Sequence, residues 1–292
     1  MWAALVCVLL LAGCTQTFAT NEFGRLTVVT STTVLKDLTQ AVAGDDVTVI
    51  SVVPHDTDPH VYEPRPADAR LVADADVVVA NGANLEPWFT SLTQNASAQV
   101  VFIADARPWP VLFEEDGEPD PHMWMVPTLA AEYVAVIAET LADADPKNAA
   151  GYWQRAVAKQ DVLYALDQEL AQLFDVLPVE RRILVTSHDA FRYFGAQYGF
   201  TVASLYGVST ETQPSARDVQ QLVDLLRTQD IPTIFVESTI DTSVLERIAK
   251  DANVTIGAPL YGDALGPVGS PAQSYVAMMR HNAQAIVDGL RV

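Results

Sequence analysis

The sequence predicts an α/β protein of two lobes, each a parallel β-sheet flanked by helices, joined by one long spanning helix. On both sides of the middle of the chain, short runs rich in β-branched residues alternate with helix-like segments. Such alternation is typical of parallel sheets. Between the two halves, residues 145–178 contain one glycine, Gly151, and no proline between Pro146 and Pro178. A chain of 292 residues is long enough for two lobes of this kind.

The chain begins with an uncharged apolar stretch at residues 2–12. It has about half of the roughly 20 residues that a transmembrane helix needs, which predicts the core of a signal peptide. The stretch ends in Leu11-Ala12-Gly13-Cys14, which resembles a bacterial lipobox, where the cysteine is lipidated and becomes the mature N-terminus. We therefore expect residues 1–13 to be removed and Cys14 to carry lipid; a simple cleaved signal or an ordinary apolar start are the alternatives. The absence of Lys or Arg before the core departs from the usual pattern and fits a start codon further upstream.

Cysteine usage and charge narrow the class of protein. Cys7 and Cys14 are the two cysteines of the chain, so the folded part is expected to hold no disulfide and no cysteine-ligated metal. The formal net charge is 17 − 37 = −20, which excludes nucleic acid as a partner. The acidic surface is explained by solubility, with attraction of cations as the alternative.

The predicted elements follow in order along the chain. Residues 14–25 are expected to form a lipid-anchored tether. The N-terminal α/β lobe is predicted at 26–144, the spanning helix at 145–178 and the C-terminal α/β lobe at 179–292. Asp145-Pro146 gives a helix-start signal for the spanning helix. Strands are expected at 26–30, 47–53, 77–80, 100–104, 183–186, 201–205, 233–236 and 254–256, and helices at 34–43, 66–73, 128–141, 190–198, 215–228, 243–250 and 272–290.

Four side chains follow β-patterned apolar runs and predict one metal site. They are His60, His122 and His188, together with Asp263. Ligands of open α/β sheets bind beyond the carboxyl ends of the strands, so we expect these side chains to converge on one cleft. Imidazole and carboxylate groups are typical ligands of divalent cations. Taken alone, each histidine is more typical of a loop or a cap, and Asp263 of a helix cap.

Four motifs in chain order resemble the metal-binding receptor lipoproteins of bacterial ABC importers for zinc and manganese, the cluster A-I solute-binding proteins. The resemblance spans nearly all of the mature chain and implies His60 and His122 as ligands from the first lobe, with His188 and Asp263 from the second. Several manganese receptors of that family carry glutamate where this chain has His188. The motifs are Asp58-Pro59-His60-Val61-Tyr62-Glu63-Pro64, Asp120-Pro121-His122-Met123-Trp124, Ser187-His188-Asp189-Ala190-Phe191-Arg192-Tyr193-Phe194 and Gly262-Asp263-Ala264-Leu265-Gly266.

Other polar residues near these motifs have less defined roles. Glu237 or Asp189 is expected to orient an imidazole, and the sequence does not choose between them. His55 is predicted to be a solvated loop residue and His281 a helix residue, both outside the site. A metal-dependent hydrolase is the main rival class, but the chain has neither H-E-x-x-H nor G-x-S-x-G.

The resemblance, together with the predicted metal site, implies a function. We expect an extracytoplasmic receptor, not an enzyme, that captures a divalent metal ion between its lobes and delivers it to an ABC permease. It would act as a monomer, anchored by lipid at the outer face of the bacterial cytoplasmic membrane or in the periplasm. Three imidazoles and one carboxylate favour Zn²⁺, with Mn²⁺ as the alternative. The stiff spanning helix predicts a small closing motion on metal binding.

Overall fold

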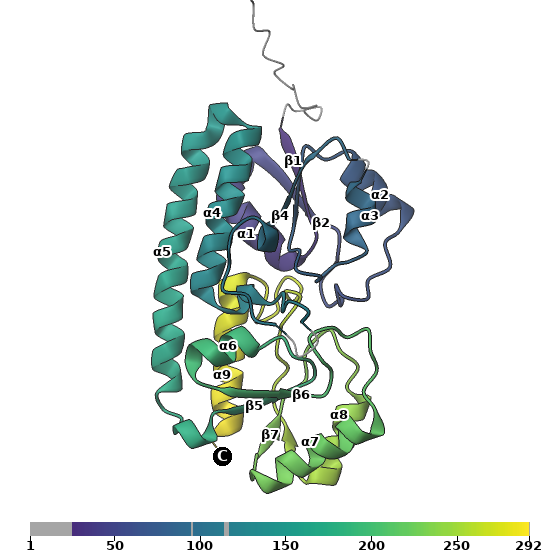
Figure 1. The fold of residues 1–292 in the computed structure, drawn as a ribbon. Helices are drawn as coiled ribbons and strands as arrows, with labels where there is room; N and C mark the ends of the chain where they lie inside the picture. The colour runs from purple at the N-terminus through teal and green to yellow at the C-terminus, as the bar shows by residue number, and fades with distance from the viewer. Residues whose placement is uncertain (1–24, 95, 114–116, 292) are drawn as a thin grey trace, which may run out of the picture.

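The computed structural model describes residues 25–94, 96–113 and 117–291. Two α/β lobes lie one above the other, and helix α5 (Ala149–Phe174) runs past both of them (Figure 1). The predicted fold class is confirmed. The expected signal peptide, the tether as far as residue 24 and Cys14 lie outside the described residues. In the described part of the chain, every helix is too short or too polar to cross a membrane.

The N-terminal lobe is built on a four-stranded parallel sheet in the order β2-β1-β3-β4. Its central strand β3 is a run of valines buried on both faces, as expected for a parallel strand covered by helices on both sides. Thr32 caps α1 by accepting a hydrogen bond from the Leu35 N–H at 3.3 Å. The elements are β1 (Leu26–Thr30), α1 (Thr33–Ala43), η1 (Gly44–Asp46), β2 (Val47–Ser51), α2 (Pro66–Ala73), β3 (Val77–Ala80), α3 (Phe89–Thr93), β4 (Gln99–Phe102) and η2 (Ile103–Asp105).

The middle of the chain forms a helical hairpin. After η3 (Met123–Met125), α4 (Pro127–Ala144) ends at Asp145, whose φ of −136° and ψ of 75° leave the helical region. Pro146 then opens the short 3-10 turn η4 (Pro146–Asn148), so α5 begins at Ala149 and not at residue 145. Its 26 residues reach about 39 Å at 1.5 Å per residue. Arg155 on α5 donates to the carbonyls of Val42 and Ala43, which fastens the end of α1 to this helix.

The C-terminal lobe contains two parallel strand pairs, β5 with β6 and β7 with β8. The Phe235 N–H donates to the Val185 carbonyl at 2.8 Å, which joins the two pairs. Strand β7 is shorter than expected. After Ile234 the chain no longer pairs with β8, and its backbone forms hydrogen bonds with Leu260 instead. The elements are η5 (Val179–Arg181), β5 (Ile183–Thr186), α6 (Arg192–Tyr198), β6 (Thr201–Ser204), α7 (Ala216–Thr228), β7 (Thr233–Ile234), α8 (Ser243–Ala252), β8 (Thr255–Ile256) and α9 (Tyr275–Leu290).

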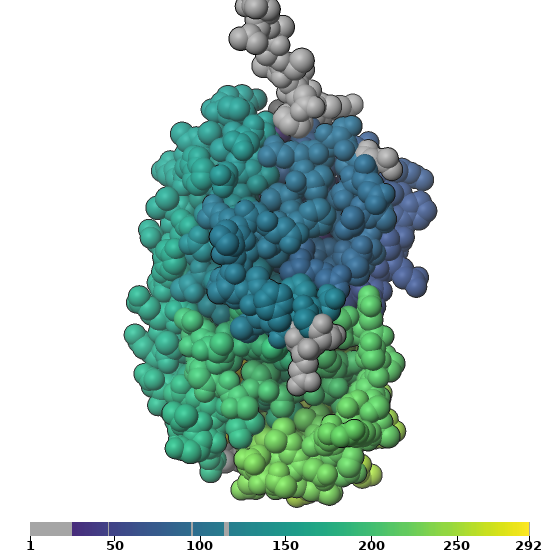
Figure 2. Space-filling model, viewed as in Figure 1, coloured from purple at the N-terminus to yellow at the C-terminus, as the bar shows by residue number. Residues whose placement is uncertain are grey.

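One hydrophobic core continues from the N-terminal lobe into the C-terminal lobe. It contains the buried faces of α1, α4, α5 and α9. Two smaller clusters lie apart from it, one on the four-stranded sheet and one on the strand pairs of the C-terminal lobe. Tyr275 at the start of α9 is fully buried and donates to the Trp124 carbonyl at 2.6 Å. The N-terminal and C-terminal halves of the chain pack directly on one another in the middle of the molecule (Figure 2).

Candidate metal centre

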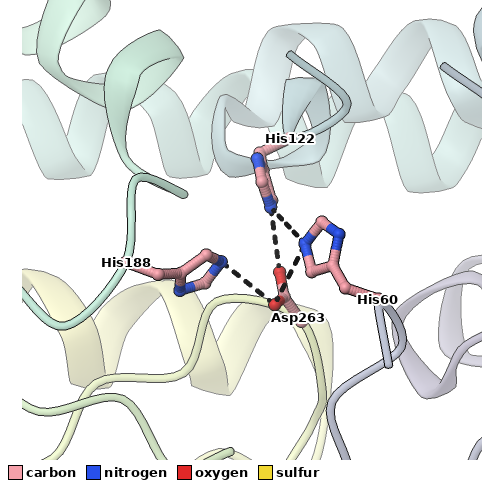
Figure 3. Close-up of side chains that lie close together, drawn as sticks. All are labelled: His60, His122, His188 and Asp263. Carbon is pink, nitrogen blue, oxygen red and sulfur yellow. Dashed lines mark hydrogen bonds and ion pairs between the residues drawn. The ribbon is translucent and has the colours of Figure 1, made fainter. Parts of the chain in front are cut away.

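The four predicted site residues meet at the junction of the lobes. His60, His122, His188 and Asp263 are all buried, and one ligand atom from each lies within 4.8 Å of the others. The three imidazoles surround the Asp263 carboxylate (Figure 3). His188 directly follows β5, as expected, whereas His60 and His122 lie on loops well beyond β2 and β4. Their convergence therefore depends on how these loops fold as well as on the direction of the strands.

His122 is held by the aspartate of its own Asp-Pro-His segment. Asp120 Oδ1 accepts from the His122 backbone N–H and lies 2.9 Å from the ring Nδ1. This contact directs the ring Nε2 toward Asp263 Oδ1, 3.2 Å away. Tyr193 donates to the Asp120 carbonyl at 2.9 Å and fixes the segment from the C-terminal lobe. Orientation of a ligand histidine through its second nitrogen is a general feature of metal sites.

His188 is held by Glu237. Glu237 Oε1 accepts from the His188 backbone N–H and from the Ser187 hydroxyl, both at 2.9 Å. Its other oxygen lies 2.7 Å from His188 Nδ1. Asp189, the other carboxylate that the sequence left open, instead lies 3.7 Å from Arg192. Of these two, Glu237 is the residue that orients the imidazole.

His60 is held differently. Asp58 Oδ1 accepts its backbone N–H at 2.9 Å, but the ring Nδ1 is buried without a hydrogen-bond partner among the described residues. The ring Nε2 lies 3.4 Å from the Nε2 of His122 and 3.8 Å from Asp263 Oδ2. His60 also lines a groove of about 620 Å³ between the lobes, which the other three site residues do not line.

Asp263 lies at the centre and is tied to the N-terminal lobe. Its Oδ2 lies 3.1 Å from His188 Nε2, so its two oxygens face two different histidines. Trp124 donates to the Gly262 carbonyl at 3.0 Å, and the Leu265 N–H donates to the Thr33 hydroxyl at 2.8 Å. A side chain at position 262 would place its Cβ 2.6 Å from Glu237 Oε2, so the close approach of this loop requires glycine.

The charges of the cluster balance one another in the absence of metal. Burial lowers the pKa of His60 to about 3, although Asp263 opposes this shift. Burial also disfavours a charge on His122, but Asp120 and Asp263 more than reverse this effect and raise its pKa to about 9. Burial acts against the Asp263 carboxylate too, yet His188 and His122 hold its pKa well below the usual range. His122 is therefore protonated and His60 neutral at pH 7.

The spacing of the donor atoms fits a metal ion. A tetrahedral zinc ion with Zn–N distances of about 2.0 to 2.1 Å separates its ligand atoms by about 3.3 Å. The contacts of Asp263 with His122, His188 and His60 are 3.2, 3.1 and 3.8 Å long. No cysteine takes part, and the two oxygens of Asp263 face the Nε2 atoms of two different histidines. The cluster can thus hold a divalent cation through three nitrogens and one or two oxygens.

The other two histidines lie outside the cluster, as expected. His55 Nδ1 lies 2.9 Å from the Leu265 carbonyl, and His281 Nε2 lies 2.8 Å from the Pro259 carbonyl. Sequence reasoning did not assign the orienting role of Asp120. Its place two residues before His122, repeated by Asp58 before His60, is the signal that could have identified both carboxylates.

Two α/β lobes pack along one long helix and enclose a buried group of side chains that could hold a metal ion. This arrangement is that of a solute-binding receptor. The chain matches the family described as zinc-uptake complex component A, periplasmic, over residues 28–289, and it belongs to this family. It is a substrate-binding protein of a metal ABC transporter and not an enzyme, and it acts outside the cytoplasm. Its partners are therefore a divalent metal ion and an ABC permease.

Relatives that align over nearly the whole chain are also named as metal-binding or metal-transport proteins. The manganese-binding lipoprotein MntA of Halalkalibacterium halodurans is 36% identical over 98% of this chain and 96% of its own length. The manganese ABC transporter substrate-binding lipoprotein PsaA of Streptococcus pneumoniae is 34% identical over 96% of this chain and 94% of its own. The periplasmic zinc-binding protein TroA of Treponema pallidum superposes with a TM-score of 0.89 at 34% identity, covering 91% of this chain and 99% of that structure.

The charge state of His122 predicts that metal binding releases protons. A pKa of about 9 means that this ring is charged at pH 7, and a metal ligand must be neutral. Apparent affinity should therefore weaken as the pH falls from 8 to 6, by about tenfold per pH unit for each displaced proton. Calorimetric titration in two buffers with different ionisation enthalpies measures the release. The His281→Gln variant should release the same number of protons as the parent, and equal heats in the two buffers would contradict the charge assignment.

Proposed function

We propose that His60, His122, His188 and Asp263 are the metal ligands, through which this receptor captures a divalent cation for its permease. One observation supports this above all: four buried side chains of ligand type direct donor atoms to one point. An ordinary buried ion-pair network would be expected to satisfy its polar atoms with hydrogen bonds. Here, among the described residues, the Nδ1 of His60 lacks such a partner, and the two Asp263 oxygens contact only the imidazoles of other candidate ligands. A bound cation offsets the cost of burying the carboxylate.

We infer that zinc is the metal bound more tightly. Three imidazole nitrogens and one carboxylate form a set that zinc accepts in tetrahedral geometry. Zinc also lies far above manganese in the affinity order of divalent metals for sites of mixed nitrogen and oxygen ligands. The distances of 3.1 and 3.2 Å from Asp263 to two histidines are compatible with this small coordination sphere.

Manganese is the second candidate, and two observations favour it. Asp263 turns one oxygen toward His122 and the other toward His188, so it can supply two oxygen ligands to one ion. A higher coordination number with more oxygen is what manganese prefers. Several relatives that span nearly the whole chain are named as manganese-binding. Metal supply in the cell then decides which ion the receptor carries.

The chain organisation supports capture followed by delivery. We propose lobes at residues 26–144 and 179–292 that act as a monomer around the spanning segment 145–178. Because the core continues along α4, α5 and α9 through both lobes, closure on metal should be small. We further propose that residues 1–13 are a signal peptide, that Cys14 carries the lipid, and that residues 14–25 tether the receptor to the membrane.

Replacement of His122 by Ala tests the ligand set. Metal that binds only the folded protein stabilises it by roughly 4 kcal/mol at a free concentration 1,000 times the dissociation constant. His122→Ala should lose most of this stabilisation, while His281→Gln should keep it. The measurement is the metal-induced rise in melting temperature of each protein, with the metal-free melting temperature as the folding control. A full rise in His122→Ala would remove this residue from the site.

Competition between metals tests the preference. The metal-free protein, offered equimolar Zn²⁺ and Mn²⁺, should bind zinc, and elemental analysis of the protein after gel filtration measures the outcome. His188→Glu exchanges a nitrogen ligand for oxygen and should narrow the advantage of zinc. If manganese displaces zinc from the parent protein, the zinc assignment is wrong.

Replacement of Cys14 by Ala tests the anchor. In a host that processes lipoproteins, the parent chain should fractionate with membranes and incorporate labelled fatty acid. Cys14→Ala should lose the label and appear in the soluble fraction, because a lipid chain supplies the membrane affinity. Cys7→Ala is the matched control and should behave like the parent. A parent chain that remains unlabelled would refute the lipidation proposal.

A further inference from the structure

A hydrogen bond joins the two lobes beside the candidate metal centre. The Thr210 hydroxyl donates to Asp58 Oδ2 at 2.6 Å across 152 positions of sequence. Thr210 lies on the C-terminal loop between β6 and α7, and Asp58 lies on the N-terminal loop between β2 and α2. Thr210 is buried, with 7% of its surface exposed. This hydrogen bond therefore links two loops that are far apart in the sequence and belong to different lobes.

The same carboxylate also holds the segment that carries His60. Asp58 uses Oδ1 to accept the His60 backbone N–H and Oδ2 to accept the Thr210 hydroxyl. The carboxylates behind the other two histidines use their oxygens differently, since Asp120 and Glu237 both reach the imidazole of their own histidine. No carboxylate contact is found at the Nδ1 of His60 in the described part of the chain, whereas the Nδ1 atoms of His122 and His188 lie 2.9 and 2.7 Å from a carboxylate oxygen. Its position therefore depends on its backbone and on the Asp58 carboxylate.

The groove between the lobes reaches the cluster at His60. His60 lines the groove, and so do Ser209 and Glu211, the neighbours of Thr210 in the chain. The other ligand loops are fastened elsewhere: Tyr193 bonds Asp120, and Trp124 bonds Gly262. Movement of the His60 segment away from the cluster must stretch or break the bond between Thr210 and Asp58. The hydrogen bond thus lies beside the place where the groove meets His60.

We propose that Thr210 is a positioning residue for metal retention: its hydrogen bond to Asp58 holds the His60 segment against the C-terminal lobe and sets the rate at which the metal leaves. This inference rests on the ligand set proposed above. A hydrogen bond to a charged carboxylate is among the stronger ones in proteins. Its loss leaves Asp58 Oδ2 without this donor and should loosen the His60 segment, which speeds dissociation of the ion.

The test compares Thr210→Val with Thr210→Ser in the full chain. Valine keeps the branched shape without the hydroxyl, whereas serine keeps the hydroxyl. Each protein is loaded with Zn²⁺ and mixed with excess chromogenic chelator, and the release rate is taken where it no longer depends on chelator concentration. Thr210→Val should release zinc about tenfold faster than the parent, from the strength of a charge-assisted hydrogen bond. Thr210→Ser should stay within about twofold of the parent, since it restores the donor.

Thr212→Val is the matched control, an exposed threonine on the same loop, and should release zinc at the parent rate. Melting temperatures of the metal-free proteins measure how far each substitution loosens the fold. Thr210→Ser and Thr212→Val should match the parent, and release from Thr210→Val is measured at a temperature where that protein is fully folded. Equal release rates for Thr210→Val and Thr210→Ser, or a parent rate in Thr210→Val, would overturn the proposal. His122→Ala separates the ligand set from the role of Thr210. If His122→Ala still binds zinc, the ligand set is wrong. If His122→Ala loses zinc and Thr210→Val releases it at the parent rate, only the role of Thr210 is wrong.

Discussion

The requirement to bury three imidazoles and a carboxylate at one point governs the architecture around the metal centre. Such a cluster is tolerated only if each charge has an opposite charge or a hydrogen bond close by. Asp263 lies between His122 and His188, and Asp120 and Glu237 lie behind those two rings. The loop that carries Asp263 approaches Glu237 so closely that a Cβ at position 262 would lie 2.6 Å from Glu237 Oε2, the oxygen that contacts His188. The backbone of these loops is thus shaped by the charges that they hold.

The lobes cannot be separated into two independent halves at this site. By sequence Asp263 belongs to the C-terminal lobe, but its loop is bonded to Trp124 and Thr33 of the N-terminal lobe. The core that continues along α4, α5 and α9 adds to this connection. His188 is held by Glu237, which lies next to β7, entirely within the C-terminal lobe. In the candidate site, His188 is therefore held within the C-terminal lobe, whereas the loop of Asp263 is held against the N-terminal lobe.

Much of this arrangement could be predicted from the sequence, and the remainder depends on tertiary contacts. Alternating strand and helix patterns predicted the two parallel sheets, because burial on both faces requires continuous β-branched runs such as β3. The four candidate ligands could be found from their motifs, because each motif is a run of neighbouring residues that can be recognised without tertiary contacts. The orienting role of Glu237 over Asp189, and the contact of Thr210 with Asp58, could not be found in this way. Each depends on two loops distant in sequence that meet only after the lobes pack. Helix α3 is five residues long, too short for a clear periodic signal.

Trp124 has a consequence for how this receptor can be observed. Its ring lies 5.2 Å from the ring of His122, and its indole N–H donates to the carbonyl of Gly262, the neighbour of Asp263. The indole thus lies against one candidate ligand and holds the loop of another, while the backbone carbonyl of Trp124 accepts from Tyr275. Fluorescence of an indole depends on the polarity and the fields around it. The chain therefore carries, in its native sequence, an optical probe that lies against the metal centre.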